Sequence, residues 1–141
     1  MKTLELLMSA RAIISEPENW LQGRLYNSDL NAACAVGALV ITVNQSRSLM
    51  DLWNSQQIAP ALHLLAELLP DDSKKDQFAV QSDYDWHKVA IYNNSHTHEE
   101  VLALFDIAIA KALVIQSQLA NTSPSVEEPA IAFRSAQLVG V

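Results

Sequence analysis

The sequence is poor in cysteine and glycine, two residue types that mark common classes of small protein. Its 141 residues include one cysteine and three glycines. The single cysteine, Cys34, cannot form an internal disulfide, which fits a reducing compartment and predicts a cytoplasmic protein. Three glycines are too few for a glycine-rich loop that cradles phosphate.

Positive charge and long apolar runs are scarce as well. Nine Lys and Arg residues stand against sixteen Asp and Glu residues, so the formal net charge is −7. The basic residues are scattered, whereas binding of nucleic acid through its phosphates requires a basic patch. The longest apolar run, AACAVGALVITV, is well short of the roughly 20 residues of a membrane span. Glu5 and Arg11 interrupt the apolar N-terminal residues before they reach signal-peptide length. We therefore expect neither a nucleic acid nor a membrane as partner.

What the sequence does contain is apolar residues at helical spacing. Half of the residues are hydrophobic, which is enough for one domain with a sizeable core. Apolar residues recur three and four positions apart in four places, and alternating β-branched runs are few. The sequence predicts an all-α fold, a compact bundle of four to five helices with a C-terminal tail.

The first two long helices are expected in the N-terminal third. The first begins at Thr3, a possible N-cap, and stops near Ser15, because Pro17 disfavours helical geometry in the residue before it. A short helical turn should follow and end near Gly23. The second long helix is expected from about Asn31, and it is apolar on nearly every side, which predicts a buried element.

Two further long helices are expected later in the chain. The third begins near Pro60, which a first turn tolerates, and ends at Pro70. Residues 71–87 are polar with embedded aromatics, which predicts a loop with a short helical piece. The last helix begins within the stretch HTHEE, where Thr97 and Glu100 have the spacing of a capping box. Helix-start chemistry therefore accounts for the acidic pair without catalysis.

From about Ala120 the composition changes, with two prolines, several small polar residues and an acidic pair. We predict a single helical domain over residues 1–119 and an extended or partner-docked tail over residues 120–141. The outer face of the last helix and the tail both carry apolar side chains that a solvated segment does not need. The predicted interaction residues are Ile107, Val114, Ile131, Phe133 and Leu138.

The motifs PENWLQG, CAVGAL and AIYNNSHTHEEVLALFDIAI resemble, over roughly residues 4–115, a family of small bacterial and phage proteins of unknown function. That family has Trp-x-x-Gly, Cys-Ala-x-Gly-Ala-Leu, Trp-Asn-Asp and Thr-His-x-x-Val-Leu-x-Leu-Phe-Asp motifs. The chain departs from them at Ala33, often Trp in the family, and at Tyr92 and Asn94, usually Trp and Asp. The resemblance implies a fold but no activity. The matching positions are Trp20, Gly23, Cys34, Gly37, Ala38, Asn93, Thr97, His98, Val101, Leu104, Phe105, Asp106 and Ala108.

Four residues are candidates for a ligand pocket: Trp20, Cys34, Asn93 and His98. Cys34 near a helix start also has, with Asn93 and either His96 or His98 as a base, the composition of a cysteine hydrolase triad. A helix N-terminus lowers a thiol pKa, which favours the reactive thiolate. The structural alternative is that Cys34 is a small buried hydrophobe. Trp20, with Trp53 and Trp86, could likewise anchor loops onto the core.

His96 and His98 could also supply metal ligands together with Glu99, Glu100, His63 or His87. Their spacing fits no established metal motif, so we expect no metal, no cofactor and no assigned catalytic residue. The sequence favours a small acidic interaction or adaptor protein that binds a protein partner or itself through the last helix and the tail. A small-ligand binding module and a cysteine-dependent hydrolase are the alternatives, so enzymatic activity is left open.

Overall fold

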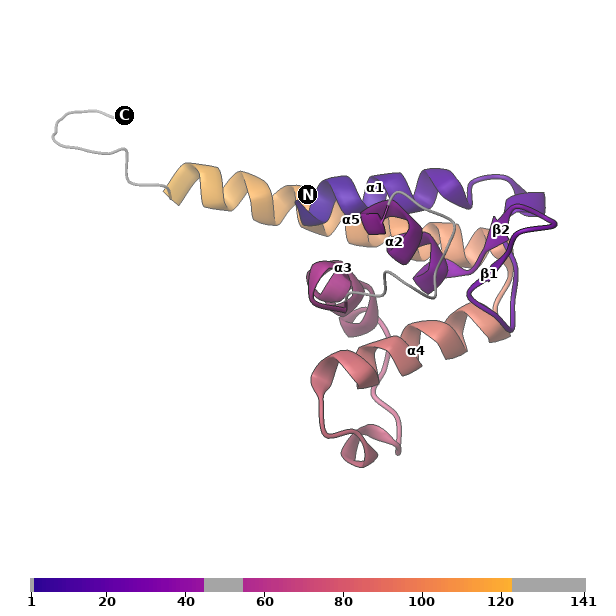
Figure 1. Ribbon diagram of the computed structural model, residues 1–141. Coiled ribbons are helices and arrows are strands. Elements are labelled where there is room, and N and C mark those ends of the chain that lie inside the picture. The colour runs from indigo at the N-terminus through magenta and orange to yellow at the C-terminus, as the bar shows by residue number, and fades with distance from the viewer. Residues whose placement is uncertain (1, 45–54, 123–141) are drawn as a thin grey trace, which may run out of the picture.

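The computed structural model of the chain describes residues 2–44 and 55–122. These ranges form five α-helices with two short 3-10 helices and one small antiparallel sheet, which confirms the predicted all-α bundle (Figure 1). In chain order the elements are α1 (Thr3–Ile13), η1 (Pro17–Asn19), β1 (Tyr26–Asn27), β2 (Ala32–Ala33), α2 (Ala35–Asn44), α3 (Ser55–Glu67), η2 (Lys75–Gln77), α4 (Gln81–Ser95) and α5 (His98–Thr122).

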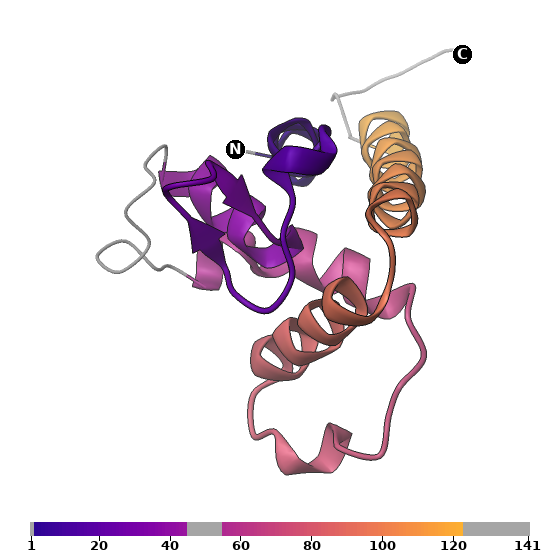
Figure 2. The same cartoon turned by 90° about the vertical axis from the view of Figure 1, so that its right-hand side faces the viewer.

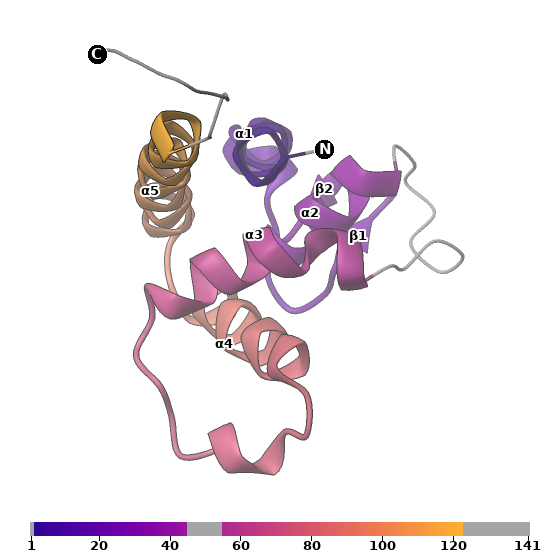
Figure 3. The same cartoon turned by 90° about the vertical axis from the view of Figure 1, so that its left-hand side faces the viewer.

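Helices α1 and α5 run antiparallel and lie side by side (Figures 1, 2 and 3). Near the start of α5, the His98 Nε2–H donates to the Ile14 carbonyl oxygen at 2.6 Å. Further along, Arg11 and Asp106 form an ion pair at 2.6 Å. Because α5 is much longer than α1, its C-terminal turns continue beyond the start of α1 (Figure 1).

Helix α2 is the buried element, as its composition predicts. Val36, Leu39 and Val40 are almost completely excluded from solvent. They join the apolar faces of α1, α3 and α5 in one continuous core, to which α4 contributes Val89. Helix α4 packs chiefly on α3 (Figure 3).

The predicted start of α2 at Asn31 is wrong by about one turn. Asn31 has a left-handed backbone with φ of 51°, which an asparagine tolerates but a helix does not. Ala32 and Ala33 pair in strand β2 with Asn27 and Tyr26 instead, so the helix begins only at Ala35.

Two other helix starts also differ from expectation. The N-cap of α1 is Lys2, and Thr3 is the first helical residue. Helix α3 begins at Ser55, so Pro60 lies inside it rather than in its first turn. Its missing N–H removes one backbone hydrogen bond, yet the apolar face of α3 buried against the core holds the helix together. The helix ends three residues before Pro70, close to the predicted end.

Helix α4 begins at Gln81, so the loop that the polar composition predicts over residues 71–87 is wrong for its second part. Helix α4 has buried polar residues where a surface helix has apolar ones, so apolar periodicity does not reveal it. Asp85, Lys88 and Asn93 are all buried in it. The expected short helical piece is present as η2, and an aromatic anchor is present too. The Tyr84 hydroxyl accepts from the Asp72 N–H at 2.8 Å.

The capping box of α5 is confirmed. The Thr97 hydroxyl accepts from the Glu100 N–H at 3.1 Å, and the Glu100 carboxylate accepts from the Thr97 N–H at 2.8 Å. The hydrogen bond from the Thr97 backbone lowers the pKa of Glu100 below its usual value. Helix α5 then runs through Ala120 to Thr122, and most of the predicted tail lies outside the described residues.

Candidate functional site

The four predicted ligand-site residues come together at the junction between the β1–β2 segment and helix α4. The indole N–H of Trp20 donates to the Asn93 side-chain oxygen at 2.7 Å. The Trp20 ring also lies against the His98 ring, with 5.4 Å between ring centroids. The backbone N–H of Ala35, directly after Cys34, donates to the same Asn93 oxygen at 3.0 Å. Trp20 thus contacts both Asn93 and His98, and Cys34 directly precedes a residue that binds Asn93; ligand binding by these residues stays a prediction.

The polar atoms at this junction bind other parts of the chain. Asn93 is 1% exposed, and its amide nitrogen donates to the Leu21 carbonyl oxygen at 3.0 Å and to Asn94 Oδ1 at 3.3 Å. Its oxygen already accepts from Trp20 and Ala35. Since a primary amide offers two donors and one acceptor oxygen, Asn93 has a partner for each of them. The geometry is that of a structural clamp.

Cys34 lies at the same junction, with 5% of its surface exposed. Its sulfur accepts from the Gly37 N–H at 3.3 Å, yet burial raises the pKa of the thiol above its usual value. A nucleophilic cysteine needs the opposite shift, because the thiolate is the reactive form. The two histidines expected as its base bind elsewhere: His98 donates to Ile14, and His96 Nδ1 lies 3.0 Å from the Tyr92 carbonyl oxygen.

Gly37 shows how tightly this junction is packed. A Cβ atom at this position would overlap the carbonyl oxygen of Leu25 and lie 2.9 Å from its carbonyl carbon. The Leu25 carbonyl oxygen meanwhile accepts from the Cys34 N–H at 3.0 Å. Only glycine lets helix α2 approach this backbone so closely.

The predicted interaction residues of α5 lie on its solvent side. Ile107 and Val114 are 56% and 55% exposed. With Ala103 and Ala110, which are also exposed, they form what we call the outer α5 stripe. Trp53 and the tail residues predicted to act with this stripe, Ile131, Phe133 and Leu138, lie outside the described residues.

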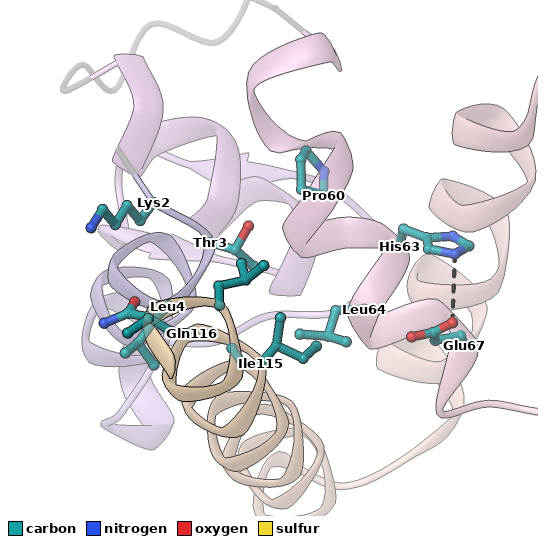
Figure 4. A pocket seen from close by; sticks show the side chains of 12 residues that line it. Lys2, Thr3, Leu4, Pro60, His63, Leu64, Glu67, Ile115 and Gln116 are labelled. Atoms are coloured by element: carbon teal, nitrogen blue, oxygen red, sulfur yellow. Dashed lines mark ion pairs between the residues drawn. The ribbon is translucent and has the colours of Figure 1, made fainter. Parts of the chain in front are cut away.

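A groove of about 900 Å³ opens where the start of α1, helix α3 and the C-terminal half of α5 meet (Figure 4). We call it the α1–α3–α5 groove. Leu4, Leu64 and Ile115 lie in its apolar centre, while Lys2 and Glu67 lie at opposite ends (Figure 4). The groove is lined by Lys2, Thr3, Leu4, Pro60, His63, Leu64, Glu67, Ala112, Ile115, Gln116, Leu119 and Ala120.

A chain of polar contacts crosses the Glu67 end of this groove. The Gln81 amide donates to Asp85 at 2.8 Å, and His63 Nδ1 lies 2.9 Å from the other Asp85 oxygen. The other ring nitrogen of His63, Nε2, lies 3.6 Å from the Glu67 carboxylate, which in turn accepts a hydrogen bond from Lys111 at 3.3 Å. These contacts link α4, α3 and α5. Within the described ranges, no three His, Cys, Asp or Glu residues are grouped so that they could hold a metal ion.

Sequence reasoning missed this groove because its three walls are far apart in the chain. One local pattern does point to the groove wall on α5, because the apolar face of the helix continues past the core at spacings of four, three and four. The residues of this pattern are Ala108, Ala112, Ile115 and Leu119. Lys2, His63 and Glu67 carry no local pattern that would assign them to one site.

Residues 1–111 match DUF6197, a family of unknown function. No curated protein and no solved structure matches the chain. Among the helices of the described ranges, none combines the length and the apolar character that crossing a membrane requires. The match covers most of the chain and confirms the expected resemblance to a family of unknown function; the protein belongs to that family.

Proposed function

We propose that this protein is a small cytoplasmic interaction module that binds a helix of a protein partner through the outer α5 stripe. The observation that carries the proposal is the exposure of Ile107 and Val114 on a helix whose opposite face already fills the core. A single buried thiol, Cys34, is in keeping with a reducing compartment.

The spacing of the stripe suits helix pairing. Ala103, Ile107, Ala110 and Val114 follow each other at intervals of four, three and four residues, the pattern of a coiled-coil seam. Alanine and a β-branched residue each recur after seven positions, so small and large side chains alternate along the stripe. This alternation lets a second helix approach closely at the alanines.

The charged residues beside the stripe have partners within the chain. Asp106 pairs with Arg11 on α1, and Lys111 pairs with Glu67 on α3. The four stripe positions themselves carry no charge. An apolar surface of this kind typically marks a contact site, because its exposure to water is unfavourable.

The two alternatives have weaker support. A ligand in the Trp20–Asn93 junction would have to displace hydrogen bonds that the fold already uses. A hydrolase based on Cys34 would need a thiolate, whose formation burial opposes. The interaction module requires no such rearrangement.

The test is to place a charge on the stripe. In the full chain, Ile107→Glu and Val114→Glu should each weaken self-association or capture of a crosslinked partner by at least about tenfold, because burying a carboxylate in a helix interface is unfavourable. Molar mass by light scattering over a concentration series measures the first, and crosslinking in cell extract followed by affinity purification measures the second.

A matched control is available on another helix. Ile91 on α4 is also a half-exposed isoleucine within a helix, so Ile91→Glu should leave both measurements unchanged. Circular dichroism must show that all three variants remain folded. If the stripe variants associate and capture partners as the unaltered chain does, the outer α5 stripe is not the contact surface.

A further inference from the structure

The α1–α3–α5 groove exposes a part of α5 that its sequence prepares for burial. Ala108 and Ala112 belong to the core, and Ile115 and Leu119 continue the same face of the helix. Yet Ile115 is 42% exposed and Leu119 is 66% exposed. The face loses its cover because α1 begins near this point and α3 crosses away (Figures 1 and 4).

The groove is also polar in a defined direction. At one end, beside the C-terminal turns of α5, lies Lys2, and the positive end of the α1 dipole adds to its charge. At the other end lies Glu67 (Figure 4), a carboxylate that stays partly exposed although it also contacts Lys111 and His63. Between these ends the surface is mainly apolar. A ligand that fits must therefore be acidic, then apolar, then basic in the direction from Lys2 to Glu67.

One segment of this chain has that order. Residues 127–134 read EEPAIAFR: two glutamates, then an apolar stretch with Ile131 and Phe133, then Arg134. We propose that this segment of the same chain occupies the α1–α3–α5 groove, with Glu127 and Glu128 toward Lys2, Ile131 and Phe133 over Ile115 and Leu119, and Arg134 toward Glu67. The pairing of charges fixes its direction as well as its place.

The connection has sufficient length. Helix α5 ends at Thr122, beside the Lys2 end, and four residues separate Thr122 from Glu127; the five Cα-to-Cα steps between them reach up to about 17 Å at extended spacing. The six Cα-to-Cα steps from Glu128 to Arg134 reach up to about 20 Å. By comparison, the face of α3 from Pro60 to Glu67 spans about 10 Å.

A short tether also makes docking favourable within one molecule. A segment attached so close to its site has an effective concentration in the millimolar range, so even weak apolar and ionic contacts suffice. A second copy could offer the same segment, but it competes only when the protein itself approaches that concentration. The proposal does not depend on the outer α5 stripe, which lies on a different face of the helix.

The experiment measures protection of the Phe133–Arg134 bond from chymotrypsin. Mass spectrometry follows the rate at which the full chain releases residues 134–141. The cleavage rate of a free peptide of residues 123–141, divided by the rate for the full chain, gives the degree of protection. Docking should slow cleavage at least about tenfold, because cleavage follows the undocked population. Cleavage at the peptide's rate would overturn the proposal.

Variants then identify the groove. Leu119→Asp should abolish the protection, whereas Leu30→Asp, a similarly exposed leucine in the β1–β2 connection, should leave it intact. Glu67→Lys and Arg134→Glu should each reduce protection several-fold, and the double variant should restore it; each is compared with a peptide of its own sequence. Equal effects of the two leucine variants, or no restoration in the double variant, would overturn the assignment.

Protein concentration separates the two sources of the segment. Protection that stays constant over a hundredfold dilution, in a protein that light scattering shows to be monomeric throughout, supports docking within one molecule. Protection that falls on dilution assigns the segment to a second copy and overturns the proposal. None of these measurements involves Ile107 or Val114. A negative result here would therefore leave the proposed outer α5 stripe unaffected, and a negative result for the stripe would leave this proposal unaffected.

Discussion

At the scale of single residues, Asn93 is the side chain that joins helix α4 to the segment before α2. Its amide binds Trp20, Leu21 and Ala35, groups from two separate parts of that segment. Asn93→Ala would leave the buried Ala35 N–H, the partly buried Trp20 N–H and the Leu21 carbonyl oxygen without their partner. Each such group costs about 1–3 kcal/mol, so we expect the free energy of unfolding to fall by about 3 kcal/mol, allowing for partial relaxation.

Urea denaturation followed by tryptophan fluorescence measures this loss. Asn94→Ala is the neighbouring control, because Asn94 is exposed and water can replace its hydrogen bond to the Gly23 N–H. The control should cost under about 1 kcal/mol. Equal losses in the two variants would show that burial of Asn93 does not make it a clamp.

At the scale of elements, helix α5 depends on how it begins. Thr97→Ala removes the hydroxyl that accepts from the Glu100 N–H, and loss of such a cap lowers the free energy of unfolding by about 1 kcal/mol. Thermal and urea denaturation at neutral pH measure the change. Thr97→Ser keeps the hydroxyl and should behave nearly as the unaltered chain; a loss as large as that of alanine would rule out the cap.

The same helix start predicts a dependence on pH. The pKa of Glu100 is lowered in the folded protein, first by the hydrogen bond from the Thr97 backbone. A carboxyl group with a lowered folded pKa stabilises the fold above its unfolded pKa, about 4.5, and this contribution is lost as pH falls through the folded value. Glu100→Gln should therefore be less stable than the unaltered chain at pH 7, and the difference should shrink in acid. A difference that is constant from pH 7 to pH 3 would contradict this linkage.

At the scale of the whole molecule, the buried core side chains of residues 2–44 and 55–122 run from Leu6 to Ala112. A chain that ends after Thr122 should therefore remain folded, with a helical circular dichroism spectrum and one cooperative unfolding transition, because no buried core side chain of the described ranges is removed. Broad, non-cooperative melting would place part of residues 123–141 in the core. It would also contradict the predicted domain boundary near residue 120.

The sequence predicts those features of the fold that depend on residues close together in the chain, and it misses those that depend on contacts between distant residues. The burial of α2 and the start of α5 follow from local features, an apolar run in one case and Thr97 with Glu100 in the other. Helix α4 has no such local signal, because the buried Asp85 and Lys88 are stabilised by His63 and Asp71, which are distant in sequence. The candidate site behaves likewise. The sequence names Trp20, Cys34, Asn93 and His98 as candidates, but the groups that bind the amide of Asn93 come from segments distant in the chain and have no local pattern.

The buried position of Cys34 has a practical consequence for following the motions of the fold. A thiol reagent can reach this sulfur only when the packing around the start of α2 opens, because Cys34 is 5% exposed in the closed state and lies in the core. When reclosing outpaces labelling, the labelling rate divided by that of a free thiol equals the fraction of time that the junction is open. As the chain has one cysteine, no other site contributes to the signal. The protein thus contains a natural reporter of the opening equilibrium around Cys34, readable with a thiol reagent and without introducing another cysteine.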